Sequence, residues 1–375
     1  MTTTLHELNP TIAHDGTRRV EHENELTGRY DDLLRHQKLS WTTHQRLNRL
    51  LGKGGQGVVY LSERRGADGF TLPIALKIFS PVRYSSAKEY DLAMERIARV
   101  AARVAQIQHD HLVHVHNFVD HNRVRMLSME WVDGYDLRRV LCNQTLAIIE
   151  HRVSLKRWEY MNNVVVTEGA EQPRLKAGVA MAIVRDCLSA LAALHREGVV
   201  HGDVKPANIM LKRTGSAKLI DIGSAFETED PPSTRTCTPR YAAPEVLEGG
   251  EATARSDLAS LGYCLLEMLA GRPLFTGLTA YKDLLQAKRI LPQRLNEILP
   301  EEVTCNELLM AFCRGLIAPD PMRRFPTAEE ADFVDNGAAA FQRQLVIGDL
   351  SVEYHEEIRL WIEEIKDLEE VSGQL

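Results

Sequence analysis

The two halves of the chain differ in the spacing of their hydrophobic residues. From Trp41 to about Val132, short runs rich in β-branched and apolar residues have the length of strands; they read GVVYLSE, PIALKIF and RMLSMEWV. One longer run in this half, SAKEYDLAMERIARVAARVAQIQ, has helical spacing. After Gly134 the spacing is mainly helical, interrupted by loop-like stretches near 201–223 and 238–245. A strand-rich half followed by a helix-rich half predicts an α+β fold with two lobes.

The outer segments and one internal segment differ from this pattern. The first 40 residues are polar with few large apolar side chains, which predicts a flexible arm. Between Leu141 and Lys176 a polar, charged stretch lacks clear periodicity, and we interpret it as an insertion. The predicted boundaries are an arm at 1–40, a two-lobed domain at 41–335 (lobes 41–132 and 133–335, insertion about 142–176) and a C-terminal helical extension at 336–375.

The C-terminal segment VEYHEEIRLWIEEIKDLEEV predicts an acidic helix with one apolar stripe. The favoured interpretation is that the stripe packs on the helix-rich lobe of its own chain, because about four turns is short for an independent coiled coil. The alternative is a dimer seam or a docking helix for a partner over residues 352–371. The stripe consists of Tyr354, Ile358, Trp361, Ile365 and Leu368.

Composition narrows the classes of function. The 375 residues are 44% hydrophobic and carry a net charge of -7, so no general basic field attracts nucleic acid or an anionic membrane. The N-terminus lacks the apolar core of a secretory signal. The most apolar helix-like run has Arg185 and Asp186 at its centre, which would be costly in lipid. Six scattered cysteines without a C-x-x-C pair indicate reduced thiols. We therefore expect a cytoplasmic protein without nucleic-acid or membrane partners.

A glycine-rich stretch, LGKGGQGVVYL, predicts a phosphate-binding loop. Gly52, Gly54 and Gly57 allow the backbone to approach phosphate groups closely, because no Cβ blocks it. A dinucleotide-binding fold needs a helix directly after the glycines, but here the chain continues as a strand. The next strand ends in IALK, and its Lys77 is placed to hold the α- and β-phosphates of a nucleotide.

Such a lysine needs a carboxylate that fixes its position. Glu95, 18 residues further on in the predicted helix, is the first choice, and Glu89 is the second. Counting back from the strand-like HDHLVHV places the expected position near Val100, which cannot pair with a lysine. We interpret the difference as about five extra residues late in the helix.

The stretch HGDVKPANIM brings acid–base and metal-binding residue types into one loop. Asp203 can accept the proton of an incoming hydroxyl group. Lys205 can neutralise charge on a phosphate, and Asn208 can bind a metal through its carbonyl oxygen. In AKLIDIGSAF, Asp221 ends an apolar strand and can bind Mg²⁺. Together and in this order, these residues indicate phosphoryl transfer.

At this point the chain resembles the eukaryotic-like (Hanks-type) serine/threonine protein kinases of bacteria. The resemblance runs from about Leu47 to Phe325. It is carried by seven motifs in the family's order: GKGGQGVV, IALK, HGDVKPAN, DIG, TPRYAAPE, SDLASLGYCLLEMLAGRPLF and DPMRRF. The family has a two-lobed fold, uses ATP with Mg²⁺ and acts on protein substrates, so the resemblance implies all three.

The resemblance also implies a role for individual residues. Around the nucleotide, it implies that the three glycines cover the phosphates, Val59 and Ala75 enclose the adenine, Lys77 pairs with Glu95, and Met129 precedes a hinge of Glu130, Trp131 and Val132. Around the phosphoryl group, it implies Asp203 as catalytic base, Lys205 and Thr238 as its partners, and Asn208 and Asp221 as Mg²⁺ ligands. For the scaffold, it implies an anchoring role for Asp257, an ion pair between Glu245 and Arg324, and a structural role for His201.

Departures from the family pattern raise two alternative functions and one prediction about regulation. Small-molecule kinases often have the same H-G-D, but they lack the lysine two residues later and the APE ending, so we favour a protein substrate. A pseudokinase is disfavoured because Lys77, Asp203 and Asp221 are all present. Gly202 replaces an arginine that contacts a phosphorylated activation segment in the family. We therefore predict an active kinase of the non-Arg-Asp type that does not need phosphorylation at Ser233, Thr234 or Thr236.

Overall fold

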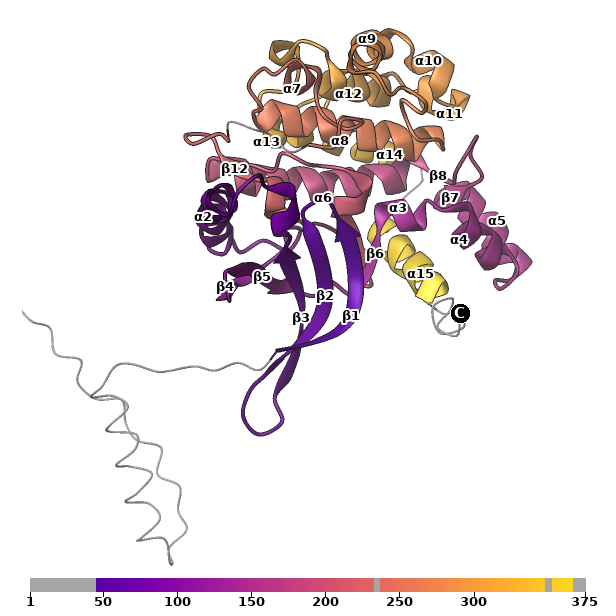
Figure 1. Cartoon of the computed structure of the whole chain (residues 1–375). Coiled ribbons are helices and arrows are strands. Elements are labelled where there is room, and N and C mark those ends of the chain that lie inside the picture. Colours follow the sequence, from indigo (N-terminus) through magenta and orange to yellow (C-terminus); the bar gives the residue numbers. More distant parts are fainter. Residues whose placement is uncertain (1–44, 233–236, 348–352, 367–375) are drawn as a thin grey trace, which may run out of the picture. The chain divides into compact units, whose positions relative to one another are not determined.

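The computed structural model describes residues 45–232, 237–347 and 353–366, and all of these except Gln45 lie in one compact unit, Arg46–Leu375. A five-stranded sheet with one long helix forms the first lobe (Figure 1). The strand order is β1-β2-β3-β5-β4, and β2 with β3, β3 with β5 and β4 with β5 pair antiparallel. The elements are β1 (Gln45–Gly54), β2 (Gly57–Arg65), β3 (Thr71–Phe79), α2 (Ala87–Val104), β4 (Val115–His121) and β5 (Val124–Glu130).

Helix α2 packs against this sheet along its apolar face. Its N-cap is Ser86, whose side chain accepts a hydrogen bond from the backbone N–H of Glu89. Tyr90, Met94 and Ala101 are buried at helical spacing. The strand and helix predictions for this half are confirmed, because the predicted segments fall within or overlap the observed elements.

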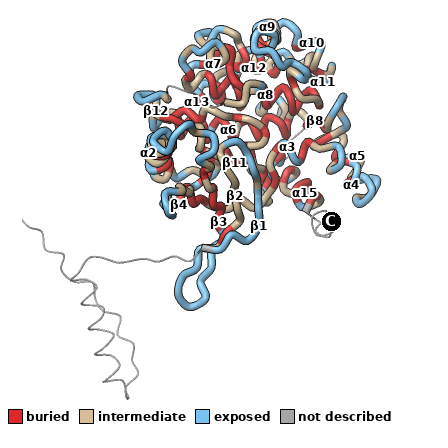
Figure 2. The backbone as a smooth tube through the Cα atoms, viewed as in Figure 1, coloured by how far each residue is buried: buried red, intermediate tan, exposed pale blue. Residues whose placement is uncertain are grey.

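The second lobe is mainly helical and is built around α6 and α8. Both helices are buried over most of their length, and Figure 2 shows the buried residues concentrated along them. The elements are β6 (Gly134–Asp136), α3 (Leu137–Val140), α4 (Asn143–Glu150), α5 (Leu155–Val164), β7 (Val166–Thr167), β8 (Arg174–Leu175), α6 (Ala177–Arg196), β9 (Val199–Val200), β10 (Ile209–Lys212), β11 (Ala217–Leu219), β12 (Phe226–Glu227), α7 (Pro244–Leu247), α8 (Ala254–Ala270), α9 (Tyr281–Ile290), α10 (Leu295–Ile298), α11 (Glu301–Thr304), α12 (Glu307–Ile317), α13 (Ala328–Phe333), α14 (Ala338–Ile347) and α15 (Tyr354–Lys366).

Helix α6 is long and apolar enough to cross a membrane, judged by length and composition alone. In this fold 83% of its most apolar window is buried inside the protein. Its apolar character is therefore explained by its place at the centre of the helical lobe.

The segment predicted as an insertion, 142–176, has regular structure that its sequence pattern does not indicate. It contains the helices α4 and α5 and the short hairpin of β7 and β8. Helix α4 buries only Leu146 and Ile149, and α5 buries only Met161, so there are too few apolar positions to reveal helices of eight and ten residues by periodicity.

The C-terminal helix α15 packs on its own chain, in contact with α6, β10 and α4. Ile358 and Trp361 are at most 1% exposed, and Tyr354 and Ile365 are also buried, while Leu368 lies outside the described residues. Arg157 of α5 reinforces the contact through ion pairs with Glu357 at 2.9 Å and Glu364 at 2.8 Å. A dimer seam on this stripe would therefore require release of α15.

Candidate functional site

One face of the first sheet collects four of the predicted site residues. Ala75 and Lys77 are two residues apart on β3, so their side chains point to the same face. Cross-strand pairing places Val59 opposite Lys77 and Met129 opposite Ala75. Ala75 and Met129 are buried, and Val59 packs against the core. The pairing register thus brings these residues together as predicted.

The glycine-rich loop is the tight turn between β1 and β2. Gly57 has a φ of 142°, and a Cβ at this position would lie 2.0 Å from the backbone oxygen of Ile78, so only glycine fits. By contrast, a Cβ on Gly52 or Gly54 would meet no atom within 4 Å. The backbone of these two glycines therefore borders open space.

The predicted hinge follows β5. Glu130 ends the strand, and its carboxylate accepts hydrogen bonds from Lys218 Nζ at 2.5 Å and from the backbone N–H of His114 at 2.6 Å. Trp131 and Val132 then connect to β6 without regular structure. The Glu130 side chain is thus engaged by the rest of the fold, which leaves its backbone for contact with a ligand.

Lys77 is almost completely buried, with 3% exposure. Its Nζ forms an ion pair with Asp221 and donates a hydrogen bond to Gln56 Oε1 at 2.6 Å. Burial alone would raise the pKa of the Asp221 carboxyl group, but the charge and hydrogen bond of Lys77 and the N–H of Gly223 hold that pKa below its usual value. Lys77 and Asp221 therefore form a closely coupled charged pair.

The predicted ion pair between Lys77 and Glu95 is not formed, and that prediction is wrong for this structure. Glu95 is exposed, because it follows the buried Met94 and therefore points about 100° away from the packed face of α2. Glu89, the second choice, instead accepts hydrogen bonds from the backbone and side chain of Ser85. Val100, the position reached by counting back, is buried and apolar.

The loop after β9 brings the next predicted residues into one hydrogen-bonded cluster. Lys205 Nζ lies 2.6 Å from Asp203 Oδ2 and donates to Thr238 Oγ1 at 2.9 Å. The Thr238 hydroxyl in turn donates to Asp203 Oδ1 at 2.8 Å. Asn208 Nδ2 donates to the backbone oxygen of Asp203 at 2.8 Å. Thr238, which is 35 positions from Asp203 in the sequence, thus helps to orient the Asp203 carboxylate.

Asn208 and Asp221 offer oxygen atoms that suit a hard cation. The Asn208 amide nitrogen is the group that donates to Asp203, so its carbonyl oxygen is the group left for a metal. Asp221 contributes a carboxylate with a lowered pKa, which stays ionised at neutral pH. Within the described residues there is no group of three or more His, Cys, Asp or Glu side chains that could hold a metal by themselves. One carboxylate and one amide fit Mg²⁺, which is usually bound by few protein groups together with phosphates and water.

Asp257 anchors the backbone of this loop. It is 1% exposed, and it accepts hydrogen bonds from the backbone N–H groups of His201 at 2.8 Å and Gly202 at 2.9 Å. His201 is fully buried, and its Nε2 lies 3.1 Å from the backbone oxygen of Ile220. The predicted anchoring and structural roles of Asp257 and His201 agree with these contacts.

The predicted ion pair between Glu245 and Arg324 is present. Both contacts of this bidentate pair measure 2.7 Å, and the Arg324 side chain is completely buried. Burial favours the neutral form of Glu245, but the hydrogen bonds and charge of Arg324 dominate and lower the pKa of the carboxyl group. The pair fixes the start of α7 to the loop before α13.

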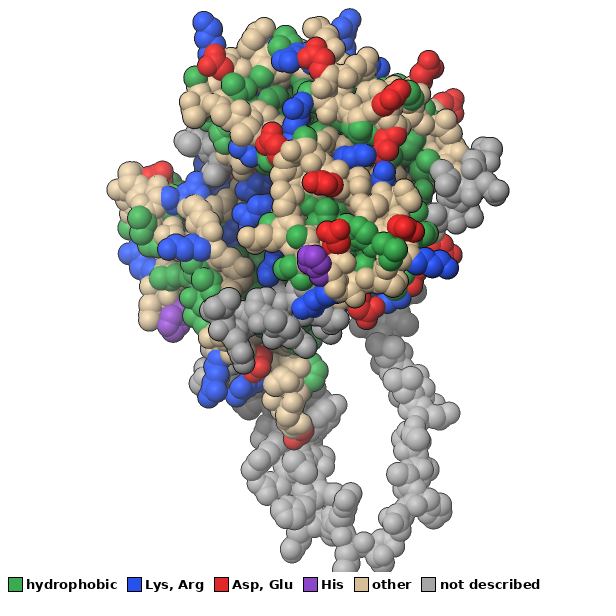
Figure 3. Space-filling model, turned by 90° about the vertical axis from the view of Figure 1, so that its right-hand side faces the viewer, with side chains coloured by type: hydrophobic (Ala, Val, Ile, Leu, Met, Phe, Trp, Pro, Cys, Tyr) green, Lys and Arg blue, Asp and Glu red, His purple; other side chains and the backbone are tan. Residues whose placement is uncertain are grey.

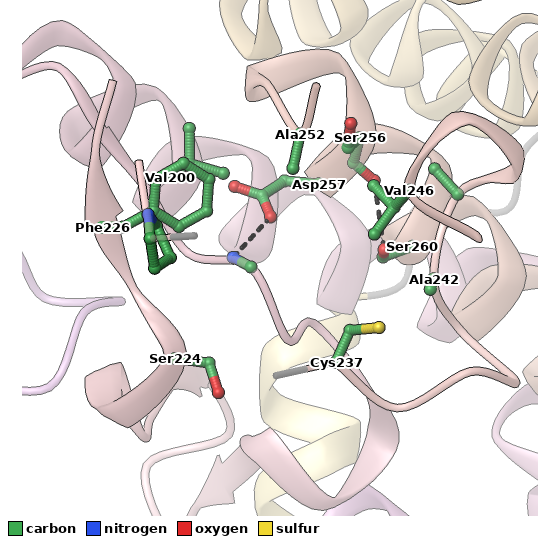
Figure 4. Close-up of a pocket in the computed structure, with 13 residues that line it drawn as sticks. Val200, Ser224, Phe226, Cys237, Ala242, Val246, Ala252, Ser256, Asp257 and Ser260 are labelled. Carbon is green, nitrogen blue, oxygen red and sulfur yellow. Dashed lines mark hydrogen bonds between the residues drawn. The ribbon is translucent and has the colours of Figure 1, made fainter. Parts of the chain in front are cut away.

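Gly202 is one of the residues that line a small cavity of about 30 Å³ (Figure 4). Its φ is 75°, and a Cβ would lie 2.8 Å from the backbone oxygen of Ser224. Around it, Val200, Phe226 and Ala252 form an apolar cluster. The cavity has room for about one water molecule, and the apolar cluster forms part of its lining beside Gly202.

Charge is unevenly distributed over one face of the molecule. On the face in Figure 3, Lys and Arg side chains gather along a hollow, whereas Asp and Glu side chains are scattered beside it.

Sequence reasoning missed two residues that contact the site. Gln56 lies in the glycine-rich stretch, and Ser224 follows the DIG motif, but neither position carries a signal of its own.

Comparison with known proteins gives the family context. The family described as "Protein kinase domain" matches residues 45–332. Among curated proteins, the serine/threonine-protein kinase PrkC of Bacillus subtilis is 29% identical over 291 residues, which cover 76% of this chain and 39% of that protein. The serine/threonine-protein kinase PknD of Mycobacterium tuberculosis is 33% identical over 231 residues, covering 60% of this chain and 30% of that protein. The serine/threonine-protein kinase PkaA of Streptomyces coelicolor is 31% identical over 256 residues, covering 65% and 42%. The matched regions span less than half of each of these relatives.

Proposed function

Because the chain belongs to the protein kinase domain family, with bacterial serine/threonine kinases among its relatives, we propose that it transfers the γ-phosphoryl group of ATP to serine or threonine hydroxyl groups of proteins. The observation that carries this proposal is the cluster of Asp203, Lys205 and Thr238, held together by three hydrogen bonds of 2.6–2.9 Å. Phosphoryl transfer depends mainly on positioning and on charge stabilisation, and this cluster provides both.

In the proposed reaction, the hydroxyl oxygen of the substrate forms a bond to the γ-phosphorus while the bond between that phosphorus and the β–γ bridging oxygen breaks. ADP leaves, and Asp203 accepts the proton of the hydroxyl group as general base. Lys205 stabilises negative charge on the transferring group, and Thr238 orients both side chains. This threonine supports a serine/threonine substrate, as the family resemblance implies.

For the nucleotide, we propose that Val59, Ala75 and Met129 enclose the adenine and that the backbone of Glu130 to Val132 bonds its edge. Gly52, Gly54 and Gly57 cover the phosphates, and Lys77 binds them. Mg²⁺, when bound by Asn208 and Asp221, would neutralise phosphate charge. The open space next to two of the glycines and the burial of Ala75 and Met129 support this arrangement.

The decisive test is phosphate transfer by the wild-type protein and by Asp203→Asn. We expect Mg²⁺-dependent transfer from radiolabelled ATP to a serine/threonine peptide library, and a loss of at least about 10²-fold in the variant, as for removal of a general base. Equal rates for the two proteins would contradict the role of Asp203. A tyrosine-only or small-molecule acceptor would contradict the substrate class.

The exposed position of Glu95 favours one alternative, an ATP-binding scaffold with weak or no catalysis. Without a carboxylate on α2, Lys77 could bind phosphates in an unproductive position. Binding of an ATP analogue by the wild-type protein without any Asp203-dependent transfer would support this alternative. A small-molecule kinase is less well supported, because the APE segment and Lys205 are both present.

We further propose that activity does not depend on phosphorylation of the activation segment. The apolar cluster of Val200, Phe226 and Ala252 occupies the neighbourhood of Gly202, where the family arginine would contact a phosphate (Figure 4). Ser233, Thr234 and Thr236 lie outside the described residues. Their combined replacement by alanine should leave most of the activity, and a collapse of the rate would refute this proposal.

The remaining proposals concern cellular context. A net charge of -7 supports neither nucleic acid nor an anionic membrane as a partner. The burial of α6 is compatible with the proposed cytoplasmic location. Fractionation of cells that produce the whole protein would test the location directly.

A further inference from the structure

The buried ammonium group of Lys77 pairs with Asp221, but it has no acidic partner on helix α2. A charge that is 97% removed from solvent must be paired or hydrogen-bonded to remain charged. Helix α2 supplies no acidic side chain to it, because Glu95 is exposed. The side chains that α2 buries are Tyr90, Met94, Val100, Ala101 and Val104, none of which carries a charge.

Gln56, at the tip of the glycine-rich loop, gives Lys77 a second polar partner besides Asp221. Its Oε1 accepts a hydrogen bond from Lys77 Nζ at 2.6 Å, and its Nε2 donates to Ser224 Oγ at 2.8 Å. Its backbone oxygen also accepts a hydrogen bond from the N–H of Ser80 at 2.9 Å, next to the end of β3. Gln56 is therefore held on both sides while its amide faces the lysine.

Gly223 shows how tightly these groups converge. A Cβ at this position would lie 2.2 Å from Gln56 Oε1, 2.5 Å from Lys77 Nζ and 3.0 Å from Asp221 Oδ1. Three polar side chains from three separate segments thus meet at one point above this glycine.

We propose that Gln56 is a positioning residue that supports Lys77 in place of a carboxylate on α2; this inference rests on the kinase activity proposed above. The amide is neutral, so it orients the ammonium group without cancelling the charge that the phosphates need. Because Gln56 belongs to the glycine-rich loop, the orientation of Lys77 depends on closure of that loop. Ser224 completes the support by fixing the amide.

Two substitutions of Gln56 separate positioning from general structural damage. Gln56→Met keeps the length of the side chain but removes both hydrogen bonds, and we expect kcat/KM for ATP to fall about tenfold, as for loss of a hydrogen bond to a charged group. Gln56→Glu keeps an acceptor but adds negative charge, so we expect kcat to be retained while KM for ATP rises. If the role of Gln56 were merely structural, both substitutions would lower kcat equally.

Further variants act as controls. Gln106→Met makes the same chemical change at an exposed position just beyond α2, and should match wild type. Ser224→Ala should reduce kcat/KM for ATP less than Gln56→Met does. The double variant of Gln56 and Ser224 should lose less than the two single losses combined, because the two residues share one hydrogen bond.

Two outcomes would overturn the inference. If Gln56→Met matches wild type in kcat and KM while Glu95→Ala loses activity about tenfold or more, helix α2 supplies the carboxylate during catalysis. If the two Gln56 variants lose kcat equally, the role is structural. If wild type transfers no phosphate, the proposed function fails, and the affinity for a non-hydrolysable ATP analogue, measured by calorimetry on the same variants, still decides whether Gln56 supports Lys77.

Discussion

The ion pair between Glu245 and Arg324 offers a sharp test of how the activation segment is held. We consider the substitution Glu245→Gln, which preserves the shape of the side chain and removes its charge. Arg324 is completely buried and, besides residue 245, has backbone acceptors at Ala318 O (2.8 Å), Arg255 O (2.9 Å) and Pro319 O (3.4 Å), none of which carries a charge. The substitution therefore leaves a buried guanidinium without a counter-charge.

Breaking one partner of a buried ion pair typically costs about 3–5 kcal/mol. The new Gln side chain retains one acceptor for Arg324, so we expect Glu245→Gln to lower the free energy of unfolding by about 3 kcal/mol. That is a large share of the 5–15 kcal/mol by which domains are usually stable. The Ser256 hydroxyl, which donates to Glu245 at 2.7 Å, can also donate to the amide oxygen and adds little to the cost.

The measurement is urea unfolding at pH 7, followed by tryptophan fluorescence, with midpoint and slope fitted separately. Glu297→Gln, in an exposed pair with Arg294, is the matched control and should change stability by less than about 0.5 kcal/mol. The double variant Glu245→Leu/Arg324→Met should regain much of the loss, because apolar residues can replace a buried ion pair. A change below 1 kcal/mol in Glu245→Gln would refute the reasoning.

The same ion pair should make the folding stability of the protein depend on pH. The pKa of Glu245 is lower in the folded protein than its unfolded value of about 4.5, so the folded state holds its proton less tightly. The contribution of the pair is therefore complete above the unfolded pKa and is lost as the pH falls through the folded pKa. The stability difference between wild type and Glu245→Gln should shrink in acid; a constant difference down to pH 3 would contradict this.

Three further predictions address other parts of the fold. Lys288 is fully buried and donates to Arg240 O at 2.7 Å, within the TPRYAAPE motif whose APE ending supports a protein substrate. Lys288→Met should therefore raise KM for a peptide but not for ATP, and equal changes in both would contradict this. A hydrogen bond to Asp186 raises the pKa of His355, so its contribution is present below the unfolded pKa of about 6.5 and is lost as the pH rises through the folded value. His355→Gln should therefore lower the thermal midpoint more at pH 6 than at pH 8, and a pH-independent effect would be the contrary result. Trp361→Ala should cost about 3–5 kcal/mol in urea unfolding, because the ring is 1% exposed; a small change would mean that α15 contributes little to stability.

The parts of the site that the sequence predicts well lie on short segments. Asp203, Lys205 and Asn208 occupy six consecutive positions, so the geometry of one loop brings them together. Thr238 is distant in sequence, but it belongs to a motif that the family resemblance identifies. The two-lobed fold can also be predicted from the sequence, because the hydrophobic spacing changes from strand-like to helical near Gly134.

The failures have a common physical cause, which is that they depend on how elements pack. The prediction of Glu95 rests on its distance in sequence from Lys77, which does not say on which face of the helix it lies, and packing on the sheet turns Met94 inward and leaves Glu95 exposed. Gln56 reaches Lys77 only because the β1–β2 turn closes over β3. Lys288 looks like an ordinary surface lysine in the sequence, yet it lies between the rings of Tyr263 and Phe275, with its Nζ at 3.8 and 4.4 Å from their centres.

The packing of α15 has a practical consequence for work with this protein. The family match ends at residue 332, and a truncation at that point would be a natural choice for producing the catalytic part alone. Such a fragment would uncover the apolar surfaces of α6 and β10 that Ile358, Trp361 and Ile362 bury. Exposed apolar patches of this kind promote aggregation. Low solubility of the shortened protein would thus reflect a missing piece of its own core, and the smallest soluble fragment should extend at least to Lys366.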